Sequence, residues 1–112
     1  MNNILNELGQ VLRDRQTADP QDSYVASLYS KGLNKILEKV GEEASEVLIA
    51  AKDTEATNNN ASRQALTGEV ADLWFHSMVM LVQLGIDPAD VQVALATRFG
   101  LSGHDEKAMR GP

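Results

Sequence analysis

Residues 69–84 read EVADLWFHSMVMLVQL, and this stretch decides what kind of fold the chain can form. From Val70 to Leu84, apolar side chains would occupy nearly every side of an α-helix. A helix that is apolar on all its faces must be surrounded by other segments. We therefore predict a central helix over about residues 63–84, ended by Gly85. Because a chain of 112 residues has few other helices to surround it, we expect a second copy to complete the packing, most simply in a symmetric dimer.

The segment before this helix has the most regular pattern in the chain and predicts a second long helix over about residues 31–53. A loop rich in Asn and Thr, over about residues 54–62, is expected to join the two long helices. The apolar residues that recur at the helical period are Leu33, Ile36, Leu37, Val40, Ala44, Val47, Leu48 and Ala51.

The remaining segments predict shorter helices. No segment alternates with period two for long enough to predict a strand. The expected fold class is therefore all-α, with four main helices arranged as a bundle, in a single domain over residues 1–108 with a frayed tail at 109–112. The shorter helices are expected over about residues 3–16, 24–29 and 88–99, with a last short turn from Ser102.

The composition is that of an ordinary globular domain, with 43% hydrophobic and 23% charged residues. Sixteen acidic residues against ten basic ones give a net charge of -6, which argues against nucleic acid as a partner. No apolar run reaches the roughly 18 residues needed to cross a bilayer, and the start, Met1 to Ile4, lacks the pattern of a signal peptide. The absence of cysteine excludes disulfides and thiolate zinc sites. We expect no membrane association and a cytoplasmic location.

Two acidic motifs on the long helices carry the strongest chemical signal. Glu43 and Glu46 are three residues apart, with Glu42 beside them, and Glu69 and Asp72 repeat the spacing, so each pair projects from one helical face. An unpaired carboxylate within an apolar helix costs several kcal/mol, so a cation is expected nearby. Antiparallel packing of the helices could gather these acids around a hard divalent ion, Mg²⁺ or Mn²⁺. For Glu42, Glu43 and Glu46 taken alone, the alternative to a metal site is an ordinary charged helix face exposed to solvent.

Three lysines suggest an anionic substrate. Lys31, Lys35 and Lys39 are spaced four apart, which would place them on one face of one helix, running toward the acids. Ammonium groups beside a metal site suit the phosphates of a polyphosphate substrate. An equally open alternative is that these lysines form ordinary ion pairs on the surface, Lys35 with Glu42 and Lys39 with Glu38. Such pairs contribute little to the free energy of folding.

Several other side chains have an ordinary packing role as their first interpretation. His76 on an apolar helix is more typical of a hydrogen-bonded core residue than of a metal ligand. Trp74 is more typical of a core or a dimer interface than of a binding site. Tyr24 and Tyr29 could stack on a base, but packing is at least as good an interpretation.

The acidic motifs and the segments around them resemble a known family. Glu42-Glu43-x-x-Glu46, a spacer of 22 residues and Glu69-x-x-Asp72 resemble the signature of the MazG-like all-α nucleoside triphosphate pyrophosphatases. Within that group, the chain resembles the phosphoribosyl-ATP pyrophosphatase family of histidine biosynthesis over nearly its whole length. The segments that carry this closer resemblance are residues 23–28, 31–33, 35–37, 39–43, 69–73 and 98–103, with Glu106-Lys107.

The resemblance implies a MazG-like fold completed by dimerisation, or by a higher homo-oligomer, and a Mg²⁺-dependent hydrolase for which Mn²⁺ could substitute. The expected reaction cleaves phosphoribosyl-ATP between the α and β phosphates to phosphoribosyl-AMP and pyrophosphate, the second step of the pathway. By the family motif, Glu43, Glu46, Glu69 and Asp72 would bind the metal, and Glu42 would orient or deprotonate the attacking water.

Two other functions remain open at this point. A house-cleaning pyrophosphatase for non-standard nucleoside triphosphates would use the same acids, and a panel of substrates would separate it from the first hypothesis. A metal-free helical dimerisation module belongs to a different class, and for such a module Mg²⁺ should change neither thermal stability nor nucleotide binding.

Overall fold

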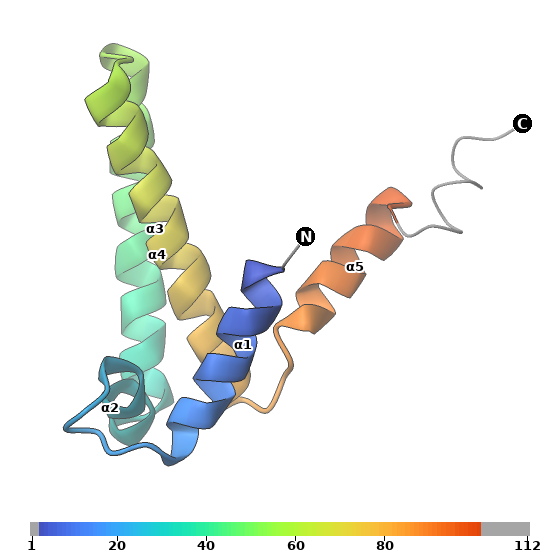
Figure 1. Cartoon of the computed structure of the whole chain (residues 1–112). Helices are drawn as coiled ribbons and strands as arrows, with labels where there is room; N and C mark the ends of the chain where they lie inside the picture. The colour runs from blue at the N-terminus through green and yellow to red at the C-terminus, as the bar shows by residue number, and fades with distance from the viewer. Residues whose placement is uncertain (1–2, 102–112) are drawn as a thin grey trace, which may run out of the picture.

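A computed structural model describes residues 3–101, and within this range the chain is all-α, as predicted. The described range contains no strand, and none of its helices is long and apolar enough to span a membrane. The turn predicted from Ser102, the domain end at 108 and the tail 109–112 lie outside the described residues. The elements are α1 (Ile4–Asp14), the 3₁₀ helix η1 (Arg15–Thr17), α2 (Tyr24–Lys31), α3 (Leu33–Ala56), α4 (Asn60–Gln83) and α5 (Ala89–Phe99) (Figure 1).

The two long helices, α3 and α4, lie side by side as an antiparallel hairpin (Figure 1). Each has 24 residues, and only Thr57 to Asn59 separate them, so the longer loop predicted over 54–62 was wrong. The physical reason is a capping box. The Asn59 side chain accepts the Ser62 backbone N–H at 2.9 Å, and the Ser62 hydroxyl accepts the Asn59 N–H at 3.0 Å. This reciprocal cap starts α4 three residues earlier than predicted.

A glycine separates α2 from α3 where the sequence predicted a continuous start at Lys31. Gly32 has φ +96°, a left-handed conformation that glycine adopts without the steric cost of a Cβ. Lys31 is consequently the last residue of α2, and α3 begins at Leu33. The predicted short helix from Tyr24 is confirmed, and the Ser23 hydroxyl caps it by accepting the Ala26 N–H at 3.1 Å.

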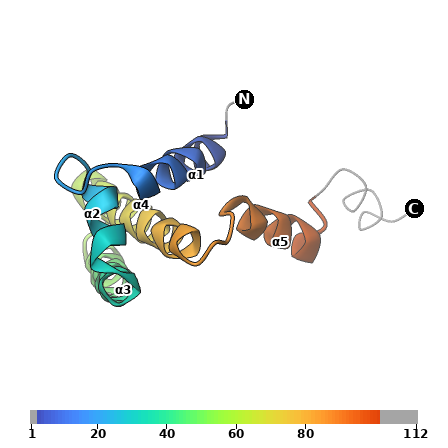
Figure 2. The same cartoon turned by 90° about the horizontal axis from the view of Figure 1, so that it is seen from below.

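The buried core occupies the end of the hairpin that α1 and α2 cover (Figures 1 and 2). Toward the Asn59 turn, the two long helices contact each other without a third layer from the same chain (Figure 1). The radius of gyration is 17.0 Å, whereas a compact domain of this length would have about 13 Å. The core side chains are Leu12, Leu28, Ile36, Met78, Val79 and Val82.

Helix α5 projects away from the hairpin and joins it through polar contacts with α1 (Figures 1 and 2). Gln92 donates from Nε2 to Asn6 Oδ1 at 2.9 Å and accepts from Asn3 Nδ2 at 2.7 Å. Arg13 pairs with Asp87 at 3.2 Å just before α5 begins. No residue of α5 is buried. This helix therefore contributes little to the core of the single chain.

The small size of the core makes each of its side chains important for stability. Ile36 is fully buried, and Ile36→Ala should lower the free energy of unfolding by about 2–5 kcal/mol, because it leaves a cavity where α2, α3 and α4 meet. Ile49 lies on the same helix with 61% of its surface exposed, so Ile49→Ala should cost only about 0.5 kcal/mol or less. Urea unfolding measures both, and equal losses would contradict this location of the core.

Candidate functional site

Three carboxylates from the two long helices converge at the middle of the hairpin. Glu43 of α3 and Glu69 and Asp72 of α4 each offer an oxygen, and these oxygens all lie within 4.8 Å of one another. Glu43 follows Ile36 by seven residues and precedes Val47 by four, so it shares the stripe of α3 that packs on α4. Its side chain is consequently only 9% exposed. The antiparallel pairing of the helices brings the two predicted acidic motifs together.

A fourth carboxylate, that of the exposed Glu46, neighbours Glu43 and Glu69 but is not one of the oxygens that converge within 4.8 Å. Burial, followed by the contact with Glu46, raises the pKa of Glu43 above its ordinary value. The contact with Glu46, followed by desolvation, raises the pKa of Glu69. Each of these two residues also has a buried Oε2 without a hydrogen-bond partner in the described part of the chain. Unsatisfied carboxylate oxygens at this density fit a hard divalent cation with oxygen ligands.

Glu42 lies beside the group and has a different environment. Its carboxylate accepts from Lys39 Nζ at 3.0 Å, and this hydrogen bond and charge hold the pKa of Glu42 below its ordinary value. It is exposed, and it is not one of the carboxylates that converge within 4.8 Å. The interpretation of the first motif as a solvated face therefore describes the exposed Glu42 and Glu46 but does not describe the buried Glu43.

The three lysines do not share one helical face, so that prediction was wrong. Gly32 places Lys31 on α2, and Lys35 and Lys39 remain on α3. Lys35 pairs with Glu38 at 3.4 Å rather than with Glu42. Lys39 lies nearest the acidic group, with Nζ 4.0 Å from Glu43 Oε1, and its hydrogen bond with Glu42 raises its pKa.

His76 is a buried, hydrogen-bonded residue, in agreement with its first interpretation. Its Nδ1 lies 2.8 Å from the backbone oxygen of Asp72, and its Nε2 lies 3.0 Å from the hydroxyl of Tyr24. Nδ1 is also 3.9 Å from Glu43 Oε1, so the ring adjoins the carboxylates. The link to Tyr24 was not predicted, because it joins residues 52 positions apart on different helices and no periodic pattern indicates such a contact.

Comparison with known proteins places the chain in a family. The family model described as phosphoribosyl-ATP pyrophosphohydrolase matches residues 5–99, which include both acidic motifs. A protein of Hydrogenovibrio crunogenus named phosphoribosyl-ATP pyrophosphatase is 55% identical over 109 residues. That match covers 97% of this chain and 94% of the relative, so the similarity extends over nearly the whole of both proteins.

The raised pKa values predict how the metal-free protein responds to pH. Glu43 and Glu69 bind protons more tightly in the folded than in the unfolded chain, so stability should fall as pH rises from 4.5 through their folded pKa values. Glu43→Gln removes one of these groups. When the pH is raised from about 5 to about 7.5 in EDTA, the Tm of Glu43→Gln should therefore fall less than the Tm of the wild type. At the upper pH, saturating Mg²⁺ should raise the wild-type Tm more than that of the variant.

Glu55→Gln is the matched control, because Glu55 lies on the same helix and pairs with Lys52 on the surface. It should behave like the wild type in both measurements. If Glu43→Gln and the wild type shared the same pH dependence and the same response to Mg²⁺, the account of this carboxylate group would be wrong.

Proposed function

Because the chain belongs to the phosphoribosyl-ATP pyrophosphohydrolase family, we propose that it hydrolyses phosphoribosyl-ATP to phosphoribosyl-AMP and pyrophosphate, the second step of histidine biosynthesis. Cleavage would occur between the α and β phosphates. The observation that carries this proposal is the convergence of Glu43, Glu69 and Asp72, in which Glu43 and Glu69 each have a buried Oε2 without a hydrogen-bond partner in the described part of the chain. A substrate whose triphosphate tail binds a divalent ion suits such a site.

The proposed cofactor is Mg²⁺, with Mn²⁺ as a substitute, held by Glu43, Glu46, Glu69 and Asp72. These residues offer only oxygen ligands, which Mg²⁺ and Mn²⁺ prefer over the nitrogen and sulfur ligands typical of zinc. A bound divalent ion would stabilise the negative charge that develops on the phosphates during cleavage. All four residues project from two helices packed against each other, which would limit the reorganisation needed when the substrate arrives.

We assign the positive side chains beside the acids to the phosphates. Lys39 is nearest, and its pairing with Glu42 keeps the ammonium group close to Glu43. A phosphate oxygen can take over the ammonium group from Glu42, which leaves that carboxylate unpaired at the edge of the site and able to orient the attacking water. Lys31 and Lys35 would contact the outer phosphates from α2 and from the first turn of α3.

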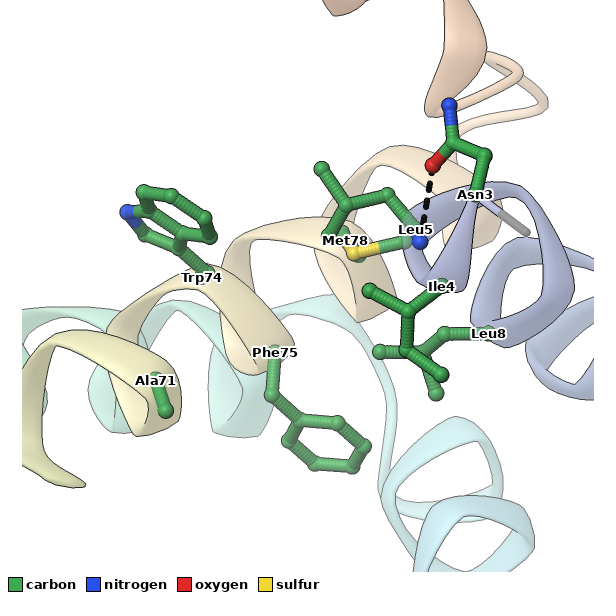
Figure 3. Close-up of a pocket in the computed structure, with 8 residues that line it drawn as sticks. All are labelled: Asn3, Ile4, Leu5, Leu8, Ala71, Trp74, Phe75 and Met78. Carbon is green, nitrogen blue, oxygen red and sulfur yellow. Dashed lines mark hydrogen bonds between the residues drawn. The ribbon is translucent and has the colours of Figure 1, made fainter. Parts of the chain in front are cut away.

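We further propose that the working form is a homodimer. Helix α4 remains incompletely covered, with Trp74 56% exposed beside a groove that α4 and α1 line (Figure 3). The groove residues are Asn3, Ile4, Leu5, Leu8, Ala71, Trp74, Phe75 and Met78. These side chains are almost all apolar, and an apolar surface of this kind marks an interface.

Helix α3 carries a second apolar stripe that faces away from the core. Leu37, Gly41 and Leu48 are four and seven residues apart, so they share one side of the helix, and both leucines are exposed. A Cβ on Gly41 would meet nothing within 4 Å, although glycine inside a helix costs about 1 kcal/mol relative to alanine. The packing of the single chain therefore does not explain Gly41, whereas close approach of a helix from a second copy would.

The proposed activity predicts a large effect from isosteric removal of charge. Glu46→Gln and Asp72→Asn should each lower kcat for pyrophosphate release from phosphoribosyl-ATP about a hundredfold or more, because the metal loses a ligand charge. Circular dichroism should show that both variants remain folded. Glu55→Gln should keep wild-type activity, since Glu55 pairs with Lys52 away from the site.

The same assay, run with phosphoribosyl-ATP, ATP and inosine triphosphate with and without Mg²⁺, separates the proposed function from its alternatives. Preference for phosphoribosyl-ATP, seen only with Mg²⁺, is the expected result. Equal rates with inosine triphosphate would favour a house-cleaning role. Near-normal hydrolysis by both Glu46→Gln and Asp72→Asn would contradict the assignment of the site.

The proposed dimer predicts a shift in mass from one substitution on the α3 stripe. Leu48→Glu should convert the dimer to a monomer in sedimentation equilibrium, because it would bury a charge in an apolar contact. Ile49→Glu, one residue on and off the stripe, should leave the dimer intact. A wild-type monomer at micromolar concentration, or equal effects of the two substitutions, would contradict this interface.

A further inference from the structure

Helix α5 has an apolar ridge that its own chain leaves uncovered. Val91, Leu95 and Phe99 are four residues apart, so they lie along one side of the helix, and each has between 45% and 64% of its surface exposed. We call these three side chains the α5 ridge. No residue of α5 is buried, and its hydrogen bonds to α1 come from Gln92 rather than from the ridge.

The ridge borders an apolar cleft between α4 and α5, two helices that diverge from the loop that joins them (Figure 1). Trp74 and Leu81 line this cleft from α4, and Val91 and Leu95 line it from α5. The volume of the cleft is about 260 Å³, whereas one helical turn occupies roughly 400 Å³. The cleft therefore has room for a row of side chains but not for a whole helix.

The proposed dimer needs more apolar surface than the α3 stripe provides. A stable interface buries about 800 Å² on each partner, far more than Leu37 and Leu48 can supply. Trp74 lines both the α4–α5 cleft and the groove beside α1, so the cleft continues the surface assigned to the second copy. The α5 ridge adds three large side chains to that surface.

The α5 ridge is suited to pair with a copy of itself. Two copies related by a two-fold axis present the same surface to each other. With Leu95 at the axis, antiparallel α5 helices place Val91 of one copy opposite Phe99 of the second copy. Asp90 in the first turn then lies near Arg98 in the last turn of the other helix, so opposite charges meet at both ends of the contact.

We propose that α5 of one copy packs antiparallel on α5 of a second copy, with each ridge inserted into the α4–α5 cleft of the other. This inference rests on the proposed homodimer and adds a contact independent of the α3 stripe. It explains why α5 projects from the hairpin without a buried residue of its own (Figure 1).

Single-cysteine variants test this pairing, because the wild-type chain contains no cysteine. Leu95→Cys would bring two thiols together at the two-fold axis, where facing helices approach closely enough for a disulfide. At micromolar concentration, mild oxidation should give at least about fivefold more covalent dimer with Leu95→Cys than with Thr97→Cys, and dilution should not lower the yield. Thr97 is the matched control, since it is exposed two residues on and faces the opposite side of α5.

A charged side chain at the same position gives an independent measurement. Leu95→Glu should raise the Kd of the dimer at least about tenfold in sedimentation equilibrium, because it places two carboxylates in an apolar contact. Thr97→Glu should leave this Kd unchanged. Both variants should keep the wild-type circular dichroism, because α5 contributes no buried residue to the single chain.

Equal crosslinking of the two cysteine variants, or an unchanged Kd in Leu95→Glu, would overturn the inference. The proposed function would then still stand if the wild-type protein hydrolyses phosphoribosyl-ATP and Leu48→Glu separates the two copies. Absence of that hydrolysis from a protein that crosslinks through Leu95→Cys would overturn the proposed function alone.

Discussion

The convergence of carboxylates from both long helices, from the buried Glu43 through the half-buried Glu69 to the exposed Asp72, is the constraint on which the rest of the structure depends. The α3–α4 hairpin places Glu43, Glu69 and Asp72 within 4.8 Å of one another, in contact with Glu46. Burial, followed by the contact with Glu46, raises the pKa of Glu43, and the contact with Glu46, followed by desolvation, raises the pKa of Glu69, so both side chains hold protons more tightly than a free carboxyl group. A hard divalent ion would offset the repulsion among these carboxylates at neutral pH. The feature that costs stability is therefore the feature that would bind metal and phosphate.

The location of this group explains why the single chain looks incomplete. Helices α1 and α2 cover one end of the hairpin (Figure 1), and the core lies there. The acids lie toward the middle of α3 and α4. Where α3 and α4 contact only each other, the side of each helix that faces away from the other stays uncovered. That surface includes the exposed apolar side chains of Leu37, Leu48 and Ile49 on α3. It also includes Trp74 on α4, beside its groove (Figure 3). A second copy would bury them and hold the carboxylates more rigidly.

Periodicity and spacing in the sequence predicted the features that repeat along one helix. The stripe from Leu33 to Ala51 and the three-residue spacings of the acids were sufficient to predict the long helices and the convergence of both motifs. Features set by one backbone angle or by a distant contact were not predictable in this way. Gly32 could have continued a helix, and only its positive φ moves Lys31 onto α2. The contact between Tyr24 and His76 depends on how α2 packs, which no local pattern encodes.

The central claim is that carboxylates from both long helices jointly hold one hard divalent ion. The most direct measurement is the anomalous difference map of a crystal soaked in Mn²⁺. The account predicts a strong peak between α3 and α4, within about 2.0–2.6 Å of oxygens from Glu43, Glu69 and Asp72. A map with no peak there, and with these side chains turned away from one another, would contradict it.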